Sequence, residues 1–251
     1  MLNTEIYIRI RWGKKDQSIS EAANQVSRLL LFLAQHDTVY EKLFLVTGEE
    51  EKDYEFASIA SMEPHYISSK ICERYLESNR RELEKHNPGI IINSAFKEPV
   101  GFLLSFYSSE NPFKSFAIRI TIGKYGKADF PNQILLTFPS KYLNDGVWFK
   151  LIFEYLVDNF DPEKGGIYPE FTNRLKGSPR EYPGWISYYS RSFDLPIIPP
   201  TVEKQDFKNG TMFFVTQDDF DVQNRKHIER WKEFYLKFLD RYPLTKNNLA
   251  N

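Results

Sequence analysis

Three segments with alternating apolar residues, in the middle of the 251-residue chain, most constrain its fold. They cover 100–107, 116–122 and 134–138, and Pro139 ends the third. A two-residue period places every second side chain on one face of a strand. Asn111-Pro112 lies in the short turn between the first two segments, so they are predicted to form a hairpin. The third strand would extend the hairpin into an antiparallel meander.

Helix and strand patterns alternate along the rest of the chain. A capping signal at Ser18 or Ser20, with Glu21 in the first turn, begins the first helix. Further helices are expected at 64–86, about 142–158 and around 228–238, and strands at 6–10, 167–168, 185–190 and 211–216. This order predicts an α+β fold, a mostly antiparallel sheet packed by amphipathic helices, in a single domain. The domain would cover 1–245, followed by a polar tail at 246–251.

The segment at 142–158 is predicted to be the central core helix. Its apolar residues form two neighbouring ridges with four-residue spacing: Leu143, Val147, Leu151 and Tyr155, and then Trp148, Ile152 and Leu156. A helix that is apolar nearly all round is expected to be buried.

Composition excludes several functions. With 33 basic and 34 acidic residues the formal net charge is -1, which argues against binding nucleic acid directly. One cysteine and four scattered histidines predict neither a disulfide nor a structural zinc site. The longest apolar run, 29–34, is too short for a membrane span of about 20 residues. We therefore expect a cytoplasmic protein without a metal, a cofactor or a membrane partner.

No hydrolase or nucleotide-binding motif occurs, and no catalytic residues are predicted. Three groups of side chains are candidates for binding a protein partner. They are the acidic residues Glu49, Glu50, Glu51 and Asp53, the aromatic residues Trp185 and Tyr188, and the acidic pair Asp218 and Asp219. Each group has a simpler explanation: a solvated acidic loop over 48–56, core packing and capping of the last helix, respectively.

Three short motifs follow one another along the chain. The first is Ile-Arg-Ile-Arg-Trp-Gly at 8–13, followed by a polar loop and an amphipathic helix. The second is Pro-Gly-Trp-Ile-Ser-Tyr at 183–188, and the third is the strand at 210–216 with the loop and helix after it. In this order the motifs resemble the immunity-protein-52 family of bacterial polymorphic toxin systems. The similarity spans about residues 5–240, although Lys14-Lys15 replaces the family's more usual Pro-Arg.

This resemblance implies a cytosolic immunity protein for interbacterial competition. Such a protein binds and neutralises a cognate toxin domain, often a nuclease with a restriction-endonuclease fold, by occluding its active site. The family is a binding family, so the resemblance implies no catalytic residue. Two alternatives remain open, a hydrolase that uses clustered carboxylates and a self-assembling scaffold protein. The sequence does not define the oligomeric state.

Overall fold

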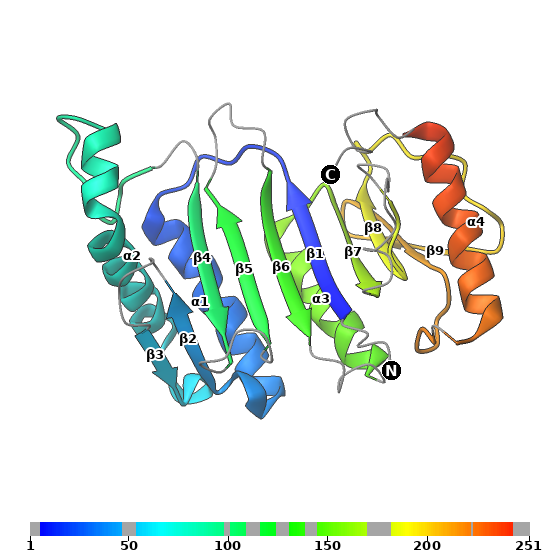
Figure 1. Ribbon diagram of the computed structural model, residues 1–251, viewed down its shortest axis with the longest axis horizontal. Helices are drawn as coiled ribbons and strands as arrows, with labels where there is room; N and C mark the ends of the chain where they lie inside the picture. Colours follow the sequence, from blue (N-terminus) through cyan, green and yellow to red (C-terminus); the bar gives the residue numbers. More distant parts are fainter. Residues whose placement is uncertain are drawn as a thin grey trace. The chain divides into compact units, whose positions relative to one another are not determined.

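A computed structural model of the protein describes residues 6–46, 54–97, 101–108, 116–123, 131–138, 145–169, 182–221 and 223–242. The chain divides into two compact units. Residues 13–136 form one, here called the continuous unit, and residues 1–12 with 137–251 form the other, the split unit. Each unit has its own strands and helices (Figure 1).

The described part of the continuous unit contains antiparallel strands in the order β3-β2-β4-β5-β6. The strands are β2 (Lys42–Val46), β3 (Tyr54–Ala57), β4 (Phe102–Tyr107), β5 (Ala117–Ile122) and β6 (Asn132–Phe138), which runs past the end of the unit. The helices are α1 (Ile19–His36) and α2 (Pro64–His86), with short 3-10 turns at Thr38–Tyr40 and Ile59–Ser61. Strands β4 and β5 form the predicted hairpin, in which Phe102 is opposite Ile122.

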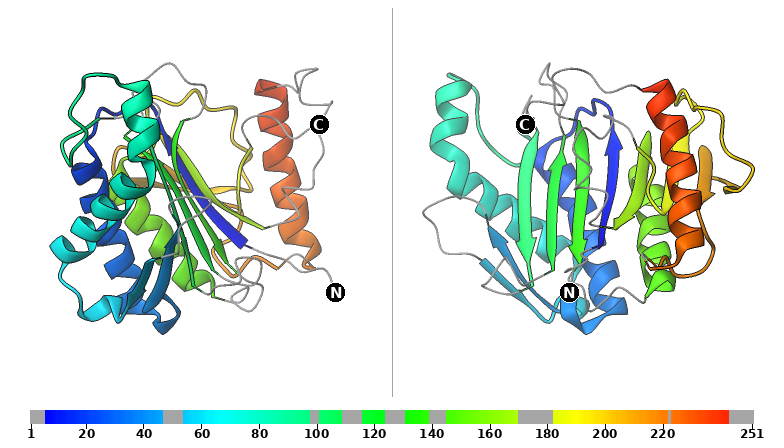
Figure 2. Two further views of the ribbon diagram at one scale, coloured as in Figure 1. Left: turned by 60° about the vertical axis from the view of Figure 1, so that its left-hand side comes forward. Right: turned by 45° about the vertical axis from the view of Figure 1, so that its right-hand side comes forward.

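One face of the β4–β5 hairpin is covered by helix and the other is open. Helices α1 and α2 pack against each other, and both lie on the same side of these strands (Figure 2, blue and cyan). On that side the Tyr75 ring of α2 meets Phe102 of β4 edge-on, with 5.3 Å between ring centres. On the other face Leu103 is 63% exposed and Arg119 is also exposed. The alternation of apolar residues along β4 and β5 therefore reflects strands that are covered by helices on one face only.

The split unit brings the start of the chain against its C-terminal half. Its described strands follow the order β1-β7-β8-β10-β9, and neighbouring strands are antiparallel. They are β1 (Ile6–Trp12), β7 (Lys164–Pro169), β8 (Ile186–Ser190), β9 (Glu203–Phe207) and β10 (Gly210–Phe214), with helices α3 (Gly146–Phe160) and α4 (Arg225–Arg241). Ile8 of β1 is opposite Ile167 of β7, so the first strand completes a sheet made mainly by residues beyond 160.

Helices α3 and α4 cover opposite faces of β10. Successive side chains of a strand point to opposite faces, and here Phe213 and Phe214 face different helices. The Phe213 ring lies 6.0 Å from the ring of Phe234 on α4. The Lys150 ammonium of α3 lies 5.1 Å from the centre of the Phe214 ring. Both faces of this part of the sheet are therefore covered, which explains why β8 and β10 are almost fully buried.

The predicted α+β class and the antiparallel strands are confirmed, with two corrections. The expectation of an acidic loop over 48–56 is wrong for residues 54–56, because β3 begins at Tyr54 and pairs with β2. The helix expected to be buried nearly all round has an exposed ridge, described below. Strands β2 and β9 were not predicted from the sequence. The extent of the domain, 1–245 with a tail at 246–251, stays a prediction, because residues from 243 lie outside the described part.

Candidate functional site

Helix α3 exposes apolar side chains along one ridge. Val147 is 83% exposed and Leu151 is 39% exposed, whereas Trp148 and Ile152 on the other ridge are buried. The expectation that this helix is buried nearly all round is therefore wrong for this ridge, because only one of the two apolar ridges faces the sheet. We call Val147 and Leu151 the α3 stripe. Exposed apolar residues grouped on one element are a common feature of surfaces that bind partners.

A hollow of about 680 Å³ opens beside the first turn of α3, and we call it the α3 hollow. Gly146, Val147 and Lys150 of α3 form one wall. Trp185, Ile186 and Phe214, all buried, form the floor. The turn at 217–219, which follows β10, forms the rim, and its Asp219 lies next to Gly146. All of these residues belong to the split unit, so β8, β10 and α3 together define the site.

Two carboxylates cap the N-terminus of α3 at the edge of this hollow. Asp145 accepts a hydrogen bond from the Trp148 amide through Oδ1, at 3.2 Å. Asp219 reaches across from the turn, and its Oδ1 accepts a hydrogen bond from the Gly146 amide at 3.0 Å. The first amides of a helix have no partner within the helix, and the positive end of its dipole favours negative charge. The helix terminus thus fixes Asp219 in position. The alternative that the acidic pair caps the last helix is wrong for Asp219, because the N-cap of α4 is Asn224, whose side chain accepts a hydrogen bond from the Lys226 amide.

The two aromatic candidates lie in the core. The Trp185 indole is buried and its Nε1 donates a hydrogen bond to the Thr216 carbonyl oxygen at 3.1 Å. Tyr188 of β8 is fully buried, and burial raises the pKa of its hydroxyl. Both residues therefore agree with the simpler explanation that they pack in the core, although an edge of Trp185 also lines the α3 hollow. A direct contact of either residue with a partner stays a prediction.

The rim of the α3 hollow is acidic. Asp218 and Asp219 are exposed on the turn, and Asp145 is exposed at the start of α3. The nearest cation on the wall is Lys150, and Glu154 partly neutralises it, with 3.9 Å between Nζ and Oε1. This arrangement attracts cationic groups more than anionic ones.

The structure brings some predicted residues together and leaves others untested. Trp185, Asp218 and Asp219 line one hollow although they come from two separate motifs. Glu49, Glu50, Glu51 and Asp53 lie outside the described residues. Sequence reasoning missed Val147 and Lys150 as site residues. The apolar ridge that contains Val147 was visible in the sequence, but helical periodicity does not show which of two apolar ridges faces solvent.

A second cluster of charged and aromatic side chains in the split unit leaves almost no space. The Arg9 guanidinium carbon lies 5.0 Å from the ring centre of Tyr168 and 5.6 Å from that of Tyr182. The hydroxyl oxygens of Tyr7 and Tyr182 are 2.8 Å apart. The space among these residues is about 10 Å³, enough for one water molecule. We therefore assign this cluster to packing of the β1–β7 pair.

Neither a metal cluster nor a membrane-crossing helix is found in the described ranges. No group of three or more His, Cys, Asp or Glu side chains there is placed to hold a metal ion. No helix there combines the length and apolar character that crossing a membrane requires.

Comparisons with known proteins identify a similar fold. No family model matches the sequence, and no curated protein matches it. Among solved structures, the chain is similar to the Pseudomonas aeruginosa T6SS protein PA0821, with a TM-score of 0.50 and 9% sequence identity. The match covers 98% of this chain and 91% of that chain. At this level of identity the likeness shows a shared fold.

Proposed function

We propose that the protein is an immunity protein that binds and neutralises a cognate toxin domain. The observation that carries this proposal is the α3 stripe beside the acid-rimmed α3 hollow, an exposed apolar surface next to a recessed one. Partner surfaces combine apolar anchors with recesses that receive them. The ordered motifs at 8–13, 183–188 and 210–216 support an immunity protein, and the fold shared with a T6SS protein agrees with a role in bacterial competition.

In this proposal the protein acts by occlusion and catalyses no reaction. Its partner would be a nuclease, such as one with the restriction-endonuclease fold, whose cleft is basic because it binds phosphates. Carboxylates on the inhibitor then steer association, and apolar contacts slow dissociation. The protein would act in the cytoplasm of the cell that makes the toxin.

Co-purification tests this proposal directly. We would express the protein with the C-terminal domain of the product of its neighbouring gene, and then measure affinity by titration calorimetry. We expect a stable complex with nanomolar affinity and loss of the toxin's nuclease activity in the complex. Absence of binding at micromolar concentrations, with both partners folded, would contradict the proposal.

The acidic residues Glu49, Glu50 and Glu51 provide a kinetic test of electrostatic steering. Reversing their charge to lysine is expected to slow association with the toxin domain and to reduce its dependence on salt. Stopped-flow association rates at low and physiological salt measure both effects. Unchanged rates would show that this segment does not take part in binding.

A further inference from the structure

The α3 hollow has an aromatic floor beneath an acidic rim. The face of the Phe214 ring already carries one cation, the Lys150 ammonium, 5.1 Å from the ring centre. Aromatic faces attract cations through their quadrupole, and carboxylates that line the same hollow add to the attraction. Asp218 and Asp219 line the same hollow. The hollow therefore suits a cation that also has apolar surface.

Lys150 distinguishes a cationic occupant from an anionic one. Its ammonium lies on the α3 wall, 3.9 Å from the Glu154 carboxylate, and it is within the same hollow as Asp218 and Asp219. A cation that enters the hollow is repelled by Lys150 and attracted by the rim. An anion experiences the reverse. Removing one charge at a time therefore reveals the sign of the bound group.

We infer that the α3 hollow receives an arginine side chain of the toxin domain, while a neighbouring apolar side chain of the toxin covers Val147. This inference rests on the proposed function and specifies its contact surface. A guanidinium is flat, is more weakly hydrated than an ammonium and so suits an apolar floor, and pairs with a carboxylate through two hydrogen bonds, which an ammonium does not do. Covering Val147, now 83% exposed, removes apolar surface from water.

Three single variants and two control variants test the inference in the complex with the toxin domain. Asp218→Asn removes a rim charge and leaves the helix cap at Asp219 in place. Lys150→Gln removes the repelling charge, and Val147→Asp places a carboxylate on the stripe. Glu229→Gln is the matched control, an exposed carboxylate on α4, on the other face of the split unit. Leu236→Asp on α4, where Leu236 is 55% exposed, is the control for Val147→Asp.

We expect each variant to change the dissociation constant of the complex in a particular direction. Asp218→Asn weakens binding about three- to tenfold and Lys150→Gln strengthens it about two- to fivefold, because the two charges act oppositely on a buried cation. Val147→Asp weakens binding at least about tenfold, as loss of an apolar anchor does. Both α4 controls retain the wild-type affinity. Far-UV circular dichroism confirms that each variant is folded.

Each other outcome has a defined meaning. If the wild-type protein binds but all variants bind equally well, the contact is elsewhere; the inference is then wrong and the proposed function stands. If Lys150→Gln weakens binding and Asp218→Asn strengthens it, the bound group is anionic and the inference is again wrong. If the folded wild-type protein does not bind the toxin domain, the proposed function fails and this inference fails with it.

Discussion

Gly146 shows how one residue determines the shape of the candidate site. A Cβ atom at this position would lie 2.0 Å from Asp219 Oδ1 and 2.7 Å from the Trp185 ring carbon Cη2. Both distances are too short for real contacts, so only glycine allows α3 to begin this close to the turn and to the indole. The capping hydrogen bond from Gly146 to Asp219 depends on the same close approach.

The first prediction follows from this contact. Gly146→Ala should lower the free energy of unfolding by about 1–3 kcal/mol, as overpacking does in tightly packed regions. Urea denaturation followed by tryptophan fluorescence measures the change. Gly146→Ala combined with Asp219→Ala should lose less stability than the two single changes added together, because the second change removes one of the clashing atoms. Strict additivity of the two changes would show that the clash with Asp219 is unimportant.

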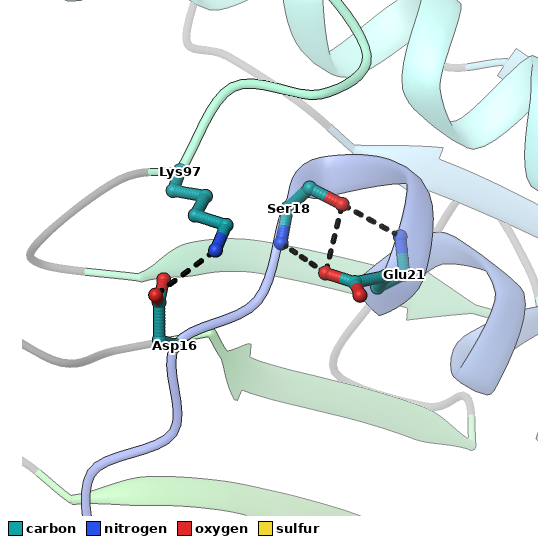
Figure 3. Close-up of polar contacts among 4 residues, drawn as sticks. All are labelled: Asp16, Ser18, Glu21 and Lys97. Atoms are coloured by element: carbon teal, nitrogen blue, oxygen red, sulfur yellow. Dashed lines mark hydrogen bonds and ion pairs between the residues drawn. The ribbon is translucent and has the colours of Figure 1, made fainter.

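At the scale of the element, the N-terminus of α1 has a complete local capping arrangement (Figure 3). The Ser18 amide and hydroxyl both donate hydrogen bonds to Glu21 Oε2, at 2.7 and 3.0 Å. The Glu21 amide donates back to the Ser18 hydroxyl oxygen at 3.3 Å. These hydrogen bonds lower the pKa of the Glu21 carboxyl, because they stabilise its charged form. Beside the cap, Asp16 and Lys97 form an ion pair with 2.9 Å between Oδ2 and Nζ.

The second prediction concerns the cap of α1. Ser18→Ala should destabilise the protein by about 0.5–2 kcal/mol at neutral pH, the usual effect of losing such a cap. Thermal or urea unfolding at pH 7 measures it. Asn24→Ala is the control, because Asn24 is exposed, lies inside the same helix and is beyond its first turn. Equal losses in the two variants would show that the Ser18 hydroxyl does not act as a cap.

The third prediction gives the pH dependence of the same cap. The folded-state pKa of Glu21 lies below its ordinary value of 4.5, so its stabilising effect is present above pH 4.5. The effect is lost as pH falls below 4.5 and through the lower folded-state pKa. Glu21→Gln does not titrate, so the stability of wild type relative to this variant should decline over that acid range and stay constant above it. Urea midpoints between pH 7 and pH 3 measure the difference. A constant difference across this range would contradict the assignment.

The elements that could be predicted from sequence are those whose signals are local. The cap at Ser18 and Glu21 and the alternation in β4 and β5 use neighbouring residues, and all three features are confirmed. Strand β9, Glu203–Phe207, has no apolar alternation because it is a charged edge strand paired on one side with β10. The α3 hollow needs three elements from separate parts of the chain, so sequence patterns indicated Trp185 and Asp218 without showing that they share one site.

In the molecule as a whole, tryptophan fluorescence distinguishes the two units, because the tryptophans are confined to one of them. The four tryptophans, Trp12, Trp148, Trp185 and Trp231, all belong to the split unit. Residues 13–136 contain no tryptophan. Tryptophan emission, excited selectively, therefore comes from the split unit alone, whereas far-UV circular dichroism reports on helices and strands of both units.

The fourth prediction uses this separation to test how the split unit is completed. Ile8 of β1 is fully buried and pairs with β7, far along the chain. Ile8→Ala should lower the unfolding free energy measured by tryptophan fluorescence by about 2–5 kcal/mol, the usual range for a buried isoleucine. Ile118→Ala is the matched change in the continuous unit, since Ile118 of β5 is also fully buried. It should leave the native emission maximum unchanged, because the altered site is in the unit without tryptophan. An unchanged fluorescence transition in Ile8→Ala would show that the opening strand is not needed to complete the unit that carries the α3 hollow.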